Sequence, residues 1–150
     1  MNVDSTLIGV SKIFLDTAPV VYFVEKHPIY SLLVSAFVQK VDAGHITAFI
    51  SPITLAECLV LPYRNNQLKL IKDFKALLLQ TAYTQFVQLN SLIAEEAAQL
   101  RAKYYLKLAD SLQIATAIHS SCELFLTNDK ALKRVVDIPI CIIDELLEKS

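Results

Sequence analysis

Four acidic side chains have the chemistry to bind a divalent metal ion together. Asp16 and Asp129 each follow a short apolar run, while Glu57 and Asp110 lie in segments with helical spacing. Four carboxylates in one small cleft would repel one another unless cations neutralised them, and their hard oxygen atoms favour Mg²⁺ or Mn²⁺. If the fold brings these residues together, the sequence predicts a metal site.

Each acid also has a purely structural interpretation. Helix capping would explain Asp16, Asp110 and Asp129, because Asp is favoured at the start of a helix. Glu57 differs, since its neighbours three and four positions away along a helix are mostly apolar: Ile53, Thr54, Val60 and Leu61. A carboxylate on an apolar face is unfavourable without a partner, unless the helix is rotated so that Glu57 meets solvent. The acids alone leave both interpretations open.

An alternation of strands and helices could bring the acids to one place. Apolar runs predict strands at residues 12–16, 46–50, 86–89, 124–127 and 140–143. Spacing and capping residues predict helices at residues 20–25, 28–41, 53–61, 66–80, 91–105 and 109–120, and a short one at 129–135. Gly44 follows the second helix, and Pro62 is expected to end the third. This order predicts an α/β fold of three layers, with a central, mostly parallel sheet between helices.

A parallel sheet explains how acids far apart in the sequence can meet. Ligands of open parallel sheets bind outside the carboxyl ends of the strands. Asp16 and Asp129 follow their strands closely, and Glu57 lies in the helix after the second strand. We therefore expect the acids to converge at that edge.

Length and composition indicate one domain over residues 1–150. The hydrophobic fraction is 54% and the mean hydropathy is +0.44, which suggests buried parallel strands, a subunit interface, or both. Charged or polar residues interrupt every apolar run before the roughly 18 residues that a membrane span needs. The N-terminal segment MNVDSTLIGV has no basic region of the kind that signal peptides carry. We expect a soluble, cytoplasmic protein with no membrane contact.

Cysteine content, charge and glycine content exclude several kinds of functional site. Cys58, Cys122 and Cys141 are widely spaced in apolar segments, so we expect buried thiols. The formal net charge is -1, so any contact with nucleic acid must depend on a local group of cations. Two glycines leave no Gly-rich phosphate loop of the P-loop or dinucleotide type.

Four segments of the sequence resemble the acidic motifs of the PIN-domain family, especially its VapC-like toxins. They are, in order, FLDTAPVVYFVE, ISPITLAECLV, LADSLQIATAI and FLTNDKAL. A further segment, IAEEAAQLRAKY, resembles the family helix that precedes the third acid. The acids of these motifs bind one or two metal ions in that family, and they correspond here to Asp16, Glu57, Asp110 and Asp129.

The resemblance implies a PIN-like fold and an activity. The expected activity is that of a Mg²⁺- or Mn²⁺-dependent endoribonuclease, which hydrolyses RNA phosphodiester bonds as the toxin of a type II toxin–antitoxin pair. The primary metal ligands would be Asp16, Glu57 and Asp110. Asp129 would bind a second metal ion or position a water molecule.

Neighbouring residues partly follow the family pattern. Thr17 and Thr127 resemble hydroxyl residues that support the metal ligands in relatives, although both could simply lie in surface turns. Many relatives carry a further acid three or four residues after the third one, where this chain has Gln113 and Ile114. A fifth acidic ligand is therefore not expected.

The resemblance also implies protein partners. A small antitoxin protein would cover the cleft with its C-terminal segment, and apolar helices would form a homodimer. Candidate interface residues, which could equally lie in the core, are Tyr22, Phe23, Leu32, Leu33 and Phe37.

Two groups of residues near the acids could contact RNA. Cations follow the last acid at helical spacing, and cations mixed with stackable rings precede Asp110. The two groups are Lys130, Lys133 and Arg134, and Lys103, Tyr104, Tyr105 and Lys107. A solvated face is the alternative; as a hypothesis, Lys130 and Arg134 hold the phosphate backbone.

Other functions fit the acids less well. A receiver-type signalling domain would need paired acids after its first strand, where Asp16 stands alone. A phosphatase of the haloacid-dehalogenase kind would need Asp-x-Asp, but Ala18 occupies the second position. A non-catalytic PIN-like module that binds RNA or protein usually has a broken acid set, whereas all four acids are present here.

Overall fold

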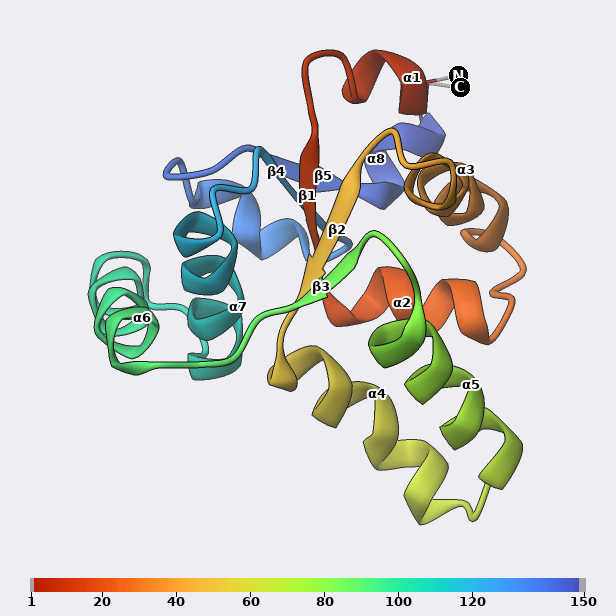
Figure 1. Ribbon diagram of the computed structural model, residues 1–150. Coiled ribbons are helices and arrows are strands. Elements are labelled where there is room, and N and C mark those ends of the chain that lie inside the picture. The colour runs from red at the N-terminus through yellow and green to blue at the C-terminus, as the bar shows by residue number, and fades with distance from the viewer. Residues whose placement is uncertain (1, 149–150) are drawn as a thin grey trace.

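Five short parallel strands form the central sheet of the computed structural model, which describes residues 2–148 (Figure 1). Their order is β3-β2-β1-β4-β5, and all neighbouring pairs are parallel. The strands are β1 (Lys12–Leu15), β2 (Thr47–Ile50), β3 (Thr84–Phe86), β4 (Leu124–Thr127) and β5 (Ile140–Ile142). The predicted three-layer α/β fold with a parallel sheet is confirmed.

Helices cover both faces of the sheet (Figure 1). They are α1 (Asn2–Thr6), α2 (Thr17–Val24), α3 (Ser31–Asp42), α4 (Pro52–Arg64), α5 (Leu68–Gln80), α6 (Ser91–Tyr104), α7 (Leu108–His119) and α8 (Ile143–Glu148), with a 3₁₀ helix, η1 (Lys130–Arg134). Buried side chains of α6 and α7 pack on one face, and those of α3 and α8 on the other. Within residues 2–148, every helix falls short of the length and apolar character that a bilayer crossing needs.

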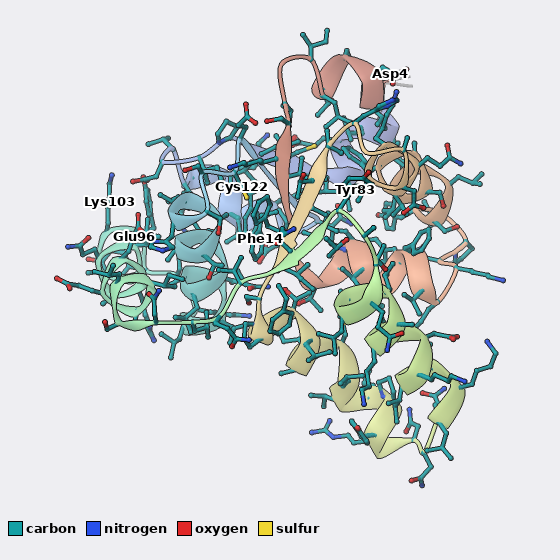
Figure 2. All side chains as sticks on the ribbon, in the orientation of Figure 1. Asp4, Phe14, Tyr83, Glu96, Lys103 and Cys122 are labelled. Carbon is teal, nitrogen blue, oxygen red and sulfur yellow. The ribbon has the colours of Figure 1, made fainter. Side chains whose placement is uncertain are left out.

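Alternation of side chains along β1 and β4 builds the two halves of the core. Phe14 and Phe125 point to the side of α6 and α7 and stack with ring centroids 5.3 Å apart (Figure 2). Ile13 and Leu126 point to the opposite side, where α3 packs. The three thiols are buried, as predicted.

The candidate interface residues of α2 and α3 differ in their burial. Leu33 and Phe37 are buried in the core on the inner side of α3, so the core location, which the sequence left equally open, holds for these two residues. Tyr22 and Phe23 are half-buried, and Leu32 is 86% exposed.

Pro62 does not end α4, contrary to the prediction. The helix continues to Arg64, and Pro62 is buried within it. A proline inside a helix removes one backbone hydrogen bond. α4 packs along α5, and burial of their shared apolar face offsets the lost bond.

Other boundaries differ by a few residues. The third strand begins at Thr84 rather than residue 86, and the ladder continues beyond it, because Val87 N–H donates to the Ile50 carbonyl at 2.9 Å. Both α1 and α8 were missed, since each is too short to show a helical period. Gly44 follows α3 as predicted and has a left-handed backbone, with φ of 77°.

Candidate metal-binding site

Asp16 lies at the carboxyl end of β1, in the middle of the sheet. From β1, the chain adds β2 and β3 on one side and β4 and β5 on the other. Open parallel sheets bind ligands at such a switch point. Asp16 also caps α2, because its Oδ1 accepts a hydrogen bond from Thr17 N–H at 2.9 Å. The cap fixes one carboxylate oxygen at the edge where ligands are expected.

The other oxygen of Asp16 is held by the neighbouring strand. Asp16 Oδ2 accepts a hydrogen bond from the Thr127 hydroxyl, at the end of β4, at 2.8 Å. The Asp16 side chain is 8% exposed. Burial raises the pKa of its carboxyl, although the hydrogen bonds from Thr127 and Thr17 act in the opposite direction. Asp16 is thus a buried and firmly oriented acid.

Glu57 joins the group from α4. Its Oε1 accepts a hydrogen bond from the Thr17 hydroxyl at 2.6 Å, so Thr17 contacts two of the acids, through its N–H and its hydroxyl. The expectation that Glu57 lies on an apolar, buried face is wrong, because Glu57 is exposed, and so are Val60 and Leu61. The rotated-helix alternative holds, and the solvated carboxylate still faces the end of β1.

Asp110 approaches the other acids from α7. It lies in the first turn of α7 and is partly buried. Burial, followed by the negative charges of Asp16, Asp129 and Glu57, raises its pKa to about 6, while Lys107 acts in the opposite direction. Asp110 therefore lies within the electrostatic influence of all three other acids.

Asp129 completes the group from the loop after β4. It is exposed, and its Oδ1 caps η1 by accepting a hydrogen bond from Ala131 N–H at 3.0 Å. Its own N–H donates to the Thr127 hydroxyl at 3.2 Å. Thr127 therefore links Asp129 to Asp16. Asp16 and Asp129 thus each cap a helix, and both also contact Thr127 at the end of β4.

A buried polar network beside the acids was missed. The Gln113 carbonyl oxygen accepts a hydrogen bond from the Ser51 hydroxyl, and its amide group donates to the Thr54 hydroxyl at 2.8 Å. All three side chains are at most 1% exposed. The bonds join α7, which carries Asp110, to the start of α4, which carries Glu57. Two signals could have indicated the network: a lone amide among the apolar residues of α7, and the capping pair Ser51 and Pro52.

The four carboxylates suit a divalent cation by their chemistry but not by their positions in this structure. Carboxylate oxygens with excess negative charge are the ligands that Mg²⁺ and Mn²⁺ prefer, so the residue types fit. Within residues 2–148, however, no three acidic, His or Cys side chains are close enough as placed to hold one ion. One carboxylate oxygen of Glu57 is bonded to Thr17, and one of Asp129 caps η1. Glu57 is exposed, so it can turn without disturbing the core.

Most cations near the acids form bonds within the chain. Lys103, Lys130 and Lys133 form ion pairs with Asp137, Asp144 and Glu145, respectively. Arg134 donates to the carbonyl oxygens of Tyr104 and Tyr105. Figure 2 shows Lys103 on the outer side of α6. Lys130 is thus already paired, which weakens the hypothesis that it holds a phosphate group.

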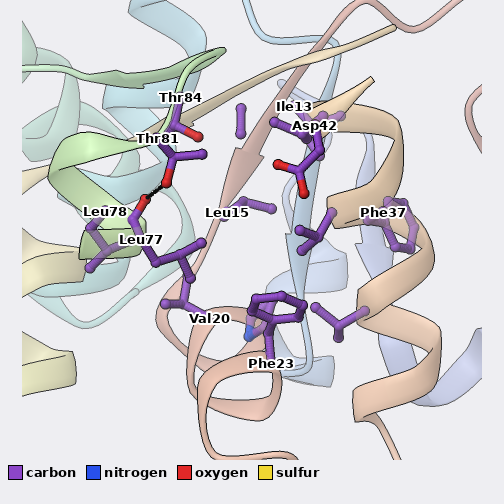
Figure 3. Close-up of a pocket in the computed structure, with 15 residues that line it drawn as sticks. Ile13, Leu15, Val20, Phe23, Phe37, Asp42, Leu77, Leu78, Thr81 and Thr84 are labelled. Carbon is purple, nitrogen blue, oxygen red and sulfur yellow. Dashed lines mark hydrogen bonds between the residues drawn. The ribbon is translucent and has the colours of Figure 1, made fainter. Parts of the chain in front are cut away.

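The apolar pocket of the structure lies away from the acids. Side chains of α2, α3 and α5 surround it above β1 and β2, among them Phe23, Phe37 and Leu77 (Figure 3). Its volume of about 30 Å³ is that of roughly one water molecule. None of the four acids lines it, so we assign it no substrate.

Comparison with known proteins agrees with the fold. A family model described as PIN domain matches residues 13–138. No curated protein sequence matches the chain significantly.

Solved structures with similar folds include chains from toxin–antitoxin complexes. A chain of VapBC2 from Rickettsia felis, bound to a DNA fragment from its promoter, superposes with a TM-score of 0.71 at 18% identity, covering 87% of this chain and 98% of that one. A toxin–antitoxin complex from Klebsiella pneumoniae gives 0.66 at 21% identity, covering 87% and 97%. VapC20 from Mycobacterium tuberculosis, a Sarcin-Ricin loop cleaving toxin, gives 0.66 at 13% identity, covering 85% and 98%.

Proposed function

The chain belongs to the PIN domain family, and from this premise we propose that it is a Mg²⁺- or Mn²⁺-dependent endoribonuclease. The proposed metal ligands are Asp16, Glu57, Asp110 and Asp129. One observation carries the proposal: Thr17 and Thr127 connect Asp16 to Glu57 and Asp129 by hydrogen bonds at the carboxyl ends of β1 and β4, and the partly buried carboxyl of Asp110 feels the charges of all three. Without a cation, this arrangement costs folding free energy, as expected of a site built for ligand binding rather than for stability.

Residues of the chain prepare the site for phosphodiester hydrolysis. Thr127 and the Thr17 N–H hold Asp16 in place, while the hydroxyl of Thr17 orients Glu57. Divalent cations, when bound there, would activate a water molecule and stabilise the charge on the leaving oxygen. In this scheme, no side chain acts as a nucleophile.

Cleavage of a mixed RNA pool tests the proposal. Purified protein should cleave RNA with Mn²⁺ or Mg²⁺ and should stop when EDTA is added. The double variant Asp16→Asn, Asp110→Asn should lose at least about 10³-fold in rate, because the loss of two ligand charges removes the bound cation that catalysis needs. The matched control is Asp73→Asn on α5, which removes a surface charge remote from β1 and should cleave like the parent.

Failure of this test would favour the alternative function. If the folded parent protein neither cleaves RNA nor binds metal, a non-catalytic PIN-like module that binds RNA or protein becomes the better description. The separate placement of Glu57 and Asp129 is the observation that would then gain weight.

We further propose that the protein is a cytoplasmic toxin with two protein partners: an antitoxin and a second copy of the chain. Support for the antitoxin comes from the similar folds in toxin–antitoxin complexes. Support for self-association comes from exposed apolar residues on α3 and before it, Leu32 (86% exposed) and Ile29 (60% exposed). Light scattering should give the mass of a dimer for the parent and of a monomer for Leu32→Lys. A parent protein that stays monomeric at high concentration contradicts the dimer.

A further inference from the structure

Tyr105 occupies a backbone position that suits a residue without a side chain. It ends α6 with φ of 56° and ψ of 40°, in the left-handed region. Glycine is the usual residue at such a position, because a Cβ atom there meets the following carbonyl oxygen. The Tyr105 side chain is 88% exposed. The chain therefore bears backbone strain in order to present an aromatic ring to solvent.

Contacts on the backbone side hold Tyr105 in this position. Arg134 donates to the carbonyl oxygen of Tyr104 at 3.0 Å and to that of Tyr105 at 3.4 Å. The Tyr104 hydroxyl accepts a hydrogen bond from Val136 N–H at 3.3 Å and donates to Asp137. Across the described part of the chain, residues 2–148, the Tyr105 ring has no hydrogen-bond partner and stacks on no other ring. The segment is thus fixed while its ring is left available.

Tyr105 lies two residues before a cation and five residues before Asp110. Lys107, two residues further on, precedes α7 and is exposed. Its charge reaches Asp110 in the first turn of that helix. Among residues 2–148, carboxylates within 4.0 Å pair with Lys103, Lys130 and Lys133 but not with Lys107. Tyr105 and Lys107 therefore lie in the loop that leads into the helix of Asp110, and both side chains are exposed.

We propose that the Tyr105 ring stacks on an unpaired base of the RNA substrate, while Lys107 contacts the phosphate group beside that base. This inference rests on the proposed ribonuclease function and names the residues that bind its substrate. An aromatic ring stacks on any base that has an open face, whereas bases inside a continuous duplex already stack on their neighbours. Tyr105 and Lys107 would thus favour single-stranded RNA and place its backbone near Asp110.

The backbone strain at Tyr105 allows a role in RNA binding to be distinguished from a role in stability, because one variant should change the two properties in opposite directions. The variant Tyr105→Gly should melt about 2–4 °C higher than the parent, since the left-handed strain is relieved. It should also bind single-stranded RNA about tenfold more weakly, because base stacking is lost. The matched control is Tyr83→Gly, at a second tyrosine with positive φ (62°), which lies at the opposite end of the sheet before β3. Its RNA affinity should equal that of the parent.

A fluorescent reporter detects stacking directly. The chain has no tryptophan, so Tyr105→Trp introduces a single one. In the Asp110→Asn background with Mn²⁺, which leaves the RNA intact, a single-stranded 12-nucleotide RNA should quench its fluorescence. A duplex of the same length should not, and Tyr83→Trp should respond to neither. Equal quenching by duplex, or quenching by a second copy of the protein without RNA, overturns the proposal.

The outcomes distinguish this inference from the proposed function. If the parent cleaves RNA and Tyr105→Gly binds and cleaves RNA equally well, the stacking role is wrong and the nuclease stands. If the parent does not cleave RNA but single-stranded RNA quenches Tyr105→Trp, the nuclease is wrong and the RNA-binding surface stands.

Discussion

The Asp110→Asn variant should be more stable than the parent protein at pH 7.5 without metal, and nearly inactive with it. Burial and three negative neighbours raise the pKa of Asp110 to about 6, so at pH 7.5 the folded chain holds an ionised carboxylate that its surroundings disfavour. A neutral amide of the same shape removes that penalty. We expect a gain of about 1–2 kcal/mol in the free energy of unfolding, because solvent screens part of the repulsion, and a loss of at least about 10³-fold in Mn²⁺-dependent cleavage.

Urea denaturation in EDTA and a cleavage assay in Mn²⁺ measure the two effects. Asp73→Asn is the matched control for stability, because Asp73 lies on α5 in a surface ion pair with Lys69 and is not among the charges that act on Asp110. It should be no more stable than the parent. If Asp110→Asn destabilises the metal-free protein, the carboxylates do not repel one another as described.

The stability of the metal-free protein should fall as pH rises from about 4 to about 7. The pKa of Asp110 in the folded chain, about 6, lies above the ordinary value of 3.8, so the folded state binds its proton more tightly than the unfolded state does. Its contribution to stability is therefore complete below about pH 4 and is lost as pH rises through about 6, by about 1–2 kcal/mol, because solvent screens a half-buried carboxylate. Burial raises the pKa of Asp16 as well, which acts in the same direction.

Metal binding should show the opposite pH dependence. A carboxylate must be deprotonated to bind a cation, so with a pKa of about 6 for Asp110 the affinity for Mn²⁺ should rise about tenfold from pH 5 to pH 7 and then level off. Urea denaturation at several pH values in EDTA, beside Mn²⁺ titrations at the same values, gives both profiles. In Asp110→Asn, the fall in stability should shrink. A metal-free protein that gains stability between pH 4 and pH 7 would contradict the assignment.

Much of the fold could be predicted because its signals are local. Each strand is a short apolar run, and the alternation with helices is enough to define a parallel sheet. Ser51 and Pro52 mark the start of α4, and Asn90 caps α6 by accepting a hydrogen bond from Ile93 N–H at 2.9 Å. The rule that acids gather at the carboxyl ends of strands then placed Asp16 and Asp129 correctly.

Features that depend on tertiary contacts could not be predicted. The exposure of Glu57 follows from the rotation of α4 about its axis, which packing on α5 decides. The ion pair between Lys130 and Asp144 could not be predicted from the sequence. It joins η1 to α8, and α8 is too short to be recognised as a helix. The bonds between Gln113 and α4 likewise arise only once α4 and α7 lie side by side.

A calorimetric titration of the metal-free protein with Mn²⁺ at pH 7.5 tests most directly whether the four acids form one metal site. We expect saturable binding by the parent, weaker binding by Glu57→Gln, and none by the double variant Asp16→Asn, Asp110→Asn. A folded parent protein that binds no Mn²⁺, or a double variant that binds it as tightly as the parent, would contradict it.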